Sequence, residues 1–169
     1  VAAMHRSGHG TPPDMAQALV WLDKAAASGN PRANLVVGQR LMKERRYTEA
    51  VVRLRQALDR MPGERSGALM LYTARMHNKD PELARRELAS AFTHDLDEWP
   101  GPIADFYLGK LDESKLLKLA REESAHALRR TCQARFAIAE RHRFTGDDAQ
   151  AKRVLDEAPE CRQGPKEAS

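Results

Sequence analysis

Residues 31–64 read PRANLVVGQRLMKERRYTEAVVRLRQALDRMPGE and contain two amphipathic stretches framed by prolines. In the second stretch, Ala50, Leu54 and Ala57 are spaced by four and then by three residues. These spacings place the three side chains on one face of a helix. Alanine on that face lets a neighbouring helix approach closely, and leucine fills the groove between the two. The segment therefore predicts a packed pair of helices.

The same Ala-Leu-Ala spacing recurs along the chain. The four copies are Ala18-Leu22-Ala25, Ala50-Leu54-Ala57, Ala84-Leu88-Ala91 and Ala151-Leu155-Ala158. The first three start 32 (50 minus 18) and 34 (84 minus 50) residues apart, and the step to the fourth is 67 (151 minus 84). Periods of this size are typical of helical repeat proteins. We expect each copy to lie in the second helix of a pair, with one degenerate unit before the fourth copy.

Glycine, proline, asparagine and aspartate predict where the helices end. These breaks are Gly8-His9-Gly10-Thr11-Pro12-Pro13-Asp14, Gly29-Asn30-Pro31, Met61-Pro62-Gly63, Asn78-Lys79-Asp80-Pro81, Trp99-Pro100-Gly101-Pro102 and Thr145-Gly146-Asp147. Asp14 and Asp80 occupy positions expected for helix N-caps, and Pro81 a first helical position. The longest uninterrupted helical stretch is expected from Ser124 to Phe144.

The composition narrows the functional classes. The chain has 169 residues and a net charge of +4, but its 28 basic residues are interspersed with 24 acidic ones along the sequence. Such a mixed surface argues against nucleic-acid binding. No apolar run approaches the roughly 18 residues that cross a bilayer, so we expect no membrane insertion. The chain begins at Val1 in patterned sequence, so a leader or upstream repeats are expected to have been removed.

Residues 31–64 resemble a tetratricopeptide repeat. The resemblance lies in Val37-Gly38, Leu41, Ala50, Leu54, Ala57 and the closing Pro62. Residues 65–98 resemble a second unit, although Tyr72 stands where a small residue is expected and Leu96 replaces the closing proline. Residues 132–161 resemble a third through Ile138-Ala139, the Gly146-Asp147 turn and the last Ala-Leu-Ala copy.

The opening residues 1–30 resemble the related Sel-one-like repeat. The match is the loop through Gly10-Thr11-Pro12 followed by Ala18-Leu19-x-Trp21-Leu22-x-Lys24-Ala25-Ala26 and Gly29. The stretch from Trp99 to Ala120, taken with Cys132, resembles lipoprotein-like tetratricopeptide proteins of the bacterial cell envelope, and residues 99–131 are expected to form a divergent unit. The resemblance implies an all-α, right-handed superhelical solenoid of antiparallel helix pairs over residues 1–162. Residues 163–169 are expected to be a disordered tail.

The resemblance also implies a binding surface. In tetratricopeptide proteins the second, fifth, ninth and twelfth positions of each unit line the concave face. These positions correspond to Arg32, Leu35, Gln39, Met42, Ser66, Leu69, Thr73, Met76, Gln133, Phe136, Glu140 and Arg143, of which Leu35 and Leu69 are expected in the core. The remaining mixture of methionine, arginine and amide side chains suits a peptide or a partner helix.

Cys132 and Cys161 are the only cysteines. If the last pair of helices turns at Thr145-Gly146, they lie about 13 residues before and about 15 after the turn. At 1.5 Å per residue both are then about 20 Å from it on adjacent helices. We therefore expect a disulfide and an oxidising compartment such as a periplasm, the alternative being two buried free thiols in a cytoplasmic protein.

No combination of residues predicts catalysis or a cofactor. His5 and His9 have a metal-chelating spacing, but no carboxylate or thiolate nearby completes a site. The paired acids Glu122-Glu123 and Asp147-Asp148 are interpreted as helix caps. Acidic residues interrupt the basic cluster of Lys43, Arg45, Arg46, Arg53, Arg55 and Arg60, which predicts a solvated face. Trp21 is expected in the core, and Trp99 under a loop or at a contact.

The sequence therefore predicts a non-enzymatic scaffold or assembly factor, bacterial and associated with the envelope, that binds another protein. Its oligomeric state is not predicted. An alternative is that the array is one domain of a longer envelope structural or regulatory protein whose activity lies elsewhere. A cytoplasmic regulator with reduced thiols is a third reading.

Overall fold

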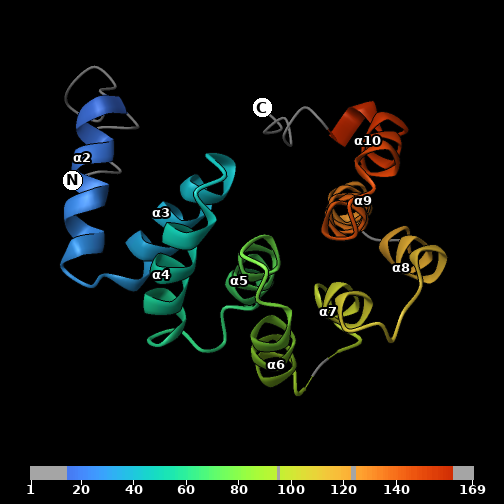
Figure 1. Cartoon of the computed structure of the whole chain (residues 1–169), viewed down its shortest axis with the longest axis horizontal. Helices are drawn as coiled ribbons and strands as arrows, with labels where there is room; N and C mark the ends of the chain where they lie inside the picture. Colours follow the sequence, from blue (N-terminus) through green and yellow to red (C-terminus); the bar gives the residue numbers. More distant parts are fainter. Residues whose placement is uncertain (1–14, 95, 123–124, 162–169) are drawn as a thin grey trace. The chain divides into compact units, whose positions relative to one another are not determined.

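The computed structural model describes residues 15–94, 96–122 and 125–161, and all regular secondary structure in these ranges is helical. Its elements are α2 (Met15–Ala27), α3 (Pro31–Lys43), α4 (Tyr47–Leu58), α5 (Arg65–His77), α6 (Pro81–Ala91), α7 (Gly101–Tyr107), α8 (Glu113–Ala120), α9 (Ala127–Phe144), α10 (Asp148–Asp156) and the 3-10 turn η1 (Pro159–Cys161) (Figure 1). Helices α2 to α5 pack in chain order, and α7 to α10 do likewise. The predicted all-α class is confirmed.

The chain divides into two compact units. Unit 1 is Val1–Ala84 and unit 2 is Arg85–Ser169, so the division falls inside α6. The residues that begin the Ala-Leu-Ala copies, Ala18, Ala50, Ala84 and Ala151, are all buried. The spacing therefore marks the packed side of α2, α4, α6 and α10, as predicted.

The breaks between helices lie at the glycine, proline, asparagine and aspartate residues that predicted them. Asn30 caps α3, because its side-chain oxygen accepts a hydrogen bond from the Ala33 amide at 3.0 Å. Gly29 has a φ of +83°, a conformation that glycine adopts without strain. Asp147 caps α10 in the same way, accepting from the Gln150 amide at 3.0 Å. Asp14 lies outside the described residues.

The break between α5 and α6 also follows the prediction. Pro81 is the first residue of α6, and Glu82 is an acidic residue in its first turn. Asp80 precedes the helix and forms an ion pair with Arg75 at 3.2 Å. The connector therefore combines a rigid first helical residue with acidic groups near the positive end of the helix dipole.

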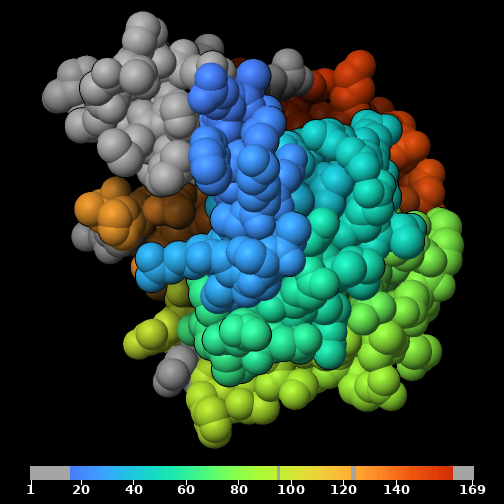
Figure 2. Space-filling model, turned by 90° about the vertical axis from the view of Figure 1, so that its left-hand side faces the viewer, coloured from blue at the N-terminus to red at the C-terminus, as the bar shows by residue number. Residues whose placement is uncertain are grey.

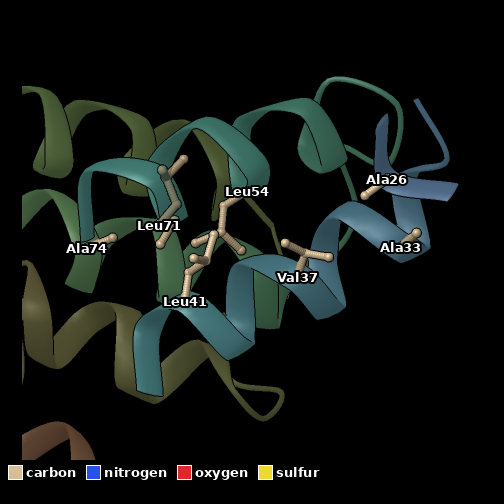
Figure 3. Packing of buried hydrophobic residues seen from close by; sticks show 8 residues of the cluster. Ala26, Ala33, Val37, Leu41, Leu54, Leu71 and Ala74 are labelled. Carbon is tan, nitrogen blue, oxygen red and sulfur yellow. The ribbon is translucent and has the colours of Figure 1, made fainter. Parts of the chain in front are cut away.

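The core of unit 1 lies between α3, α4 and α5. Its buried side chains are Ala26, Ala33, Val37, Leu41, Ala50, Leu54, Leu71 and Ala74 (Figure 3). Gly38 allows a close approach of α3 to α4, because a Cβ atom at this position would lie 2.8 Å from both Cγ and Cδ2 of Leu54. The small residue at position 38 is thus explained by packing.

Asn34 is a fully buried polar residue in this core. Its amide nitrogen donates to the carbonyl oxygens of Ala26 at 3.0 Å and Asn30 at 3.1 Å. Arg53 donates to its side-chain oxygen at 3.4 Å. These bonds connect α2, α3 and α4 and satisfy a group that would be costly to bury alone.

Unit 2 is built around α9, the longest helix of the described residues. It begins at Ala127, so the predicted repeat boundary between residues 131 and 132 falls inside a continuous helix. The largest fully buried side chains of unit 2 are Leu88, Phe106, Leu116 and Ile138. The guanidinium of Arg141 lies 4.6 Å from the centre of the Phe106 ring.

Candidate functional site

The predicted contact residues of α3 are partly available to solvent. Arg32 and Gln39 are exposed. Met42 is half-buried and packs against the core of unit 1, as does Leu35. Arg32 has no ion-pair partner among the described residues. Of the predicted contact residues on α3, Arg32 and Gln39 therefore remain available to a partner.

On α5 the predicted residues divide differently. Ser66 is exposed and Met76 is half-buried. Thr73 is buried, and its hydroxyl donates to the Leu69 carbonyl one turn earlier at 3.1 Å. The Thr73 side chain is thus engaged with its own helix, which removes it from the set available to a partner.

On α9, Phe136 is the predicted contact residue with the largest exposure, at 55%. Gln133 is half-buried, and its side-chain oxygen accepts a hydrogen bond from Trp99 Nε1 at 2.7 Å. Glu140 is only 4% exposed and binds Arg143. Phe136 therefore remains available, whereas Glu140 and Arg143 neutralise one another.

The connector before α7 packs on α9 through Trp99. Besides its hydrogen bond to Gln133, the indole lies 5.8 Å from the guanidinium of Arg130. Gly101 follows with its Cα against the backbone of Leu96, which leaves no room for a Cβ atom. The sequence left two expectations for Trp99, packing under a loop or lying at a contact with a partner. The structure favours the first.

The prediction for Trp21 was wrong. This residue is 40% exposed on α2, with its neighbours Leu19 and Val20 also exposed. Helix α2 faces the viewer in Figure 2. The Lys24 ammonium lies 4.9 Å from the centre of the Trp21 indole. Trp21 is next to the packed Leu22 in sequence, but adjacent residues differ by about 100° around a helix and so can face different surroundings.

Cys132 and Cys161 form a disulfide, with Cα atoms 5.2 Å apart. The bond joins α9 to η1 and closes a loop of 29 residues. Arg135 reinforces the same junction, donating to the Val154 carbonyl at 3.0 Å and approaching Glu157 at 3.2 Å. The predicted pairing is present, and it favours an oxidising environment.

Two of the six cations in the basic cluster of unit 1, Arg46 and Arg55, form ion pairs. Arg46 contacts Glu49 at 2.6 Å and Glu44 at 3.0 Å, and Arg55 lies 3.5 Å from Asp59. Hydrogen bonding to Glu49, then to Glu44, raises the pKa of Arg46, and the same bond to Arg46 lowers the pKa of the Glu49 carboxyl. These groups form a mixed, solvated face, as the sequence predicted.

The sequence did not reveal a hollow of about 540 Å³ in unit 2. It is lined by Gly109, Lys110, Leu111, Asp112, Glu113, Lys115, Arg141, His142 and Thr145. His142 Nε2 lies 3.0 Å from Glu113 Oε1. The signals that could have located it are Gly109, with a φ of +80°, and Asp112, which caps α8 by accepting from the Lys115 amide at 2.8 Å.

The described residues can be searched for metal-binding groups and for membrane-spanning helices. His5 and His9 lie outside the described residues. Within residues 15–94, 96–122 and 125–161, no three histidine, cysteine or acidic side chains are grouped so that they could hold a metal ion. In the same ranges no helix has the length and apolarity needed to span a membrane.

No protein-family model, curated protein or solved structure matches this chain. The resemblance to tetratricopeptide and Sel-one-like repeats therefore rests on the residues quoted for it and on the helical packing alone.

Proposed function

We propose that the chain is a non-catalytic scaffold that binds a peptide or a helix of another protein. In this proposal the helices pair antiparallel and stack into a right-handed solenoid of tetratricopeptide-like and Sel-one-like units. The first helix of each pair carries the contacts. Consecutive packing of α2 to α5 and of α7 to α10 supports this arrangement.

The observation that carries the proposal is the exposure of Arg32, Gln39 and Phe136 on helices whose opposite sides are buried. A repeat helix needs its packed side for stability, so its outer side is free to vary with the ligand. Arginine and phenylalanine are both enriched at the centres of protein interfaces.

The charge distribution supports a protein rather than a nucleic acid as the partner. Arg46 and Arg55, two of the six cations of the basic cluster, are paired with acidic side chains, which neutralises part of the charge of the cluster locally. Phosphate binding depends on releasing counterions from many uncompensated cations. A protein surface, by contrast, needs only a few charges around an apolar centre.

We also propose that the protein works in an oxidising compartment such as a bacterial periplasm. The Cys132–Cys161 disulfide supports this location, because glutathione and thioredoxin keep most cytoplasmic thiols reduced. Trapping thiols at lysis in the producing cells and then titrating them tests it. No reactive thiol is expected, and two reactive thiols would contradict the export proposal.

Affinity capture with charge-reversal variants tests the scaffold function. Wild-type protein, Arg32→Glu and the control Arg60→Glu are tagged and used to capture envelope proteins, which are quantified by mass spectrometry. Arg32 and Arg60 are both exposed, but only Arg32 belongs to the proposed face. We expect Arg32→Glu alone to lower recovery of a partner by about tenfold, the size of effect typical of a contact arginine. Equal recovery by all three proteins would refute the assignment of α3.

A further inference from the structure

Helix α9 carries two large apolar side chains that are each more than half exposed. Leu128 is 61% exposed and Phe136 is 55% exposed. They are eight residues apart, so at 1.5 Å per residue they are separated by about 12 Å along the helix axis. By contrast, Phe92 and Phe106 are buried. We call Leu128, Arg129 and Phe136 the α9 stripe.

The residues beside Phe136 are held in place on both sides. Cys132, four residues earlier, is bonded to Cys161 of η1. Gln133, three residues earlier, accepts the hydrogen bond from the Trp99 indole. Positions three and four residues apart are neighbours on a helix surface. Phe136 thus lies next to two tethered segments, and a ligand that buried it would have few side chains to immobilise.

The charge of α9 indicates the chemistry of the ligand. The helix contains five arginines and one acidic residue, Glu140. Glu140 pairs with Arg143, and Arg135 pairs with Glu157. Arg129 is exposed and has no ion-pair partner among the described residues. It precedes Phe136 by seven residues, which places both on the same line along the helix. A carboxylate beside an apolar side chain is the complement of this pair.

We propose that the α9 stripe docks an acidic amphipathic helix from a partner protein. Apolar side chains of the partner, about two turns apart, cover Leu128 and Phe136, and a carboxylate beside them pairs with Arg129. The inference rests on the proposed scaffold function and specifies the partner chemistry at one helix. Leu128 and Arg129 lie outside the positions that the repeat resemblance assigned to binding.

Selection from a displayed library of random peptides long enough to form four helical turns tests the proposal. The intact, disulfide-bonded protein is the target. Enriched peptides are expected to combine apolar residues at helical spacing with flanking Asp or Glu. Binding of a fluorescently labelled winner is then measured by anisotropy against Phe136→Ala, Arg129→Glu and the control Val20→Ala, which truncates an exposed apolar side chain of unit 1.

We expect Phe136→Ala and Arg129→Glu each to weaken binding about tenfold or more, with Val20→Ala unchanged. Raising the salt concentration should weaken the wild-type complex and have less effect on the Arg129→Glu complex. All variants should keep the wild-type circular dichroism, because each replaced side chain is exposed.

The possible failures separate the two proposals. Enriched peptides whose binding responds to Arg32→Glu and not to the α9 variants would overturn the docking inference and leave the scaffold function standing. Absence of any enriched peptide would overturn both. Enrichment of basic peptides, or tighter binding of a single-stranded oligonucleotide than of any peptide, would overturn the assignment of an acidic helix.

Discussion

Replacing Gly38 by alanine should destabilise unit 1 even though alanine favours helix. In the interior of α3 the exchange gains about 1 kcal/mol of helix propensity. The added Cβ atom, however, would lie 2.8 Å from Cγ and Cδ2 of Leu54, which is fully buried and cannot turn away into solvent. Overpacking of this kind costs about 1–3 kcal/mol. Taking the middle of that range, we expect a net loss of about 1 kcal/mol.

The Leu54→Ala background reverses the expected sign. Without the leucine Cγ and Cδ atoms the clash disappears, so Gly38→Ala should stabilise this background by about 1 kcal/mol through helix propensity alone. The coupling energy between the two sites is then about 2 kcal/mol, well above the error of additivity for independent sites. Leu54→Ala itself should cost about 2–5 kcal/mol.

Urea unfolding followed by circular dichroism gives the four free energies of this cycle. Gly63→Ala is the matched control, because no atom lies within 4 Å of the position its Cβ would take. That variant should be neutral or slightly more stable, by at most about 1 kcal/mol. If Gly38→Ala changed stability by the same amount in both backgrounds, the close approach of α3 and α4 at Gly38 would be refuted.

Three further predictions concern particular bonds. Replacing Cys132 and Cys161 together by serine removes a loop closure of 29 residues and should lower the unfolding free energy by about 3.5 kcal/mol. Urea unfolding measures this loss, with the reduced wild type as control. An unchanged unfolding free energy would contradict a stabilising role for the disulfide. Trp99→Phe keeps an aromatic ring but loses the hydrogen bond donated by Nε1. The free energy of unfolding, measured by thermal unfolding, should fall by about 1 kcal/mol. An unchanged melting temperature would argue against a stabilising contact. Arg46→Ala should raise the lowered pKa of Glu49 toward its ordinary value, as read by a carboxyl NMR titration. Because that pKa is lowered in the folded chain, the stabilising effect of the pair is present above the unfolded pKa and lost as the pH falls through the folded one; an unshifted Glu49 would show that Arg46 is not the cause.

The helix breaks were predictable because their causes are local. Asn30 caps α3 with its own side chain, Pro81 fits only a first helical position at that point, and Gly29 supplies a positive φ. The alanines of the Ala-Leu-Ala copies were predictable for a similar reason, since spacings of three and four residues put them on one helical face. The cysteine pair followed from counting residues on either side of one turn.

The division of residues 99–131 was not predicted. The break between α7 and α8 depends on Gly109 and on the Asp112 cap, in a segment without the Ala-Leu-Ala spacing. With that break missed, the hollow beside His142 could not be located either. Periodicity does not show which charged group is enclosed, so the nearly buried Glu140 was expected at a surface.

Photo-cross-linking in the producing cells tests whether the chain binds another protein through the first helix of each pair. A photoreactive phenylalanine is placed at Gln39 on α3 or at Phe136 on α9, and in matched controls at the exposed Arg55 on α4 or Lys152 on α10. We expect discrete adducts with another protein from Gln39 and Phe136, and none from Arg55 or Lys152. Adducts confined to the two control positions, or no adduct from any of the four, would contradict a scaffold that binds through the first helix of each pair.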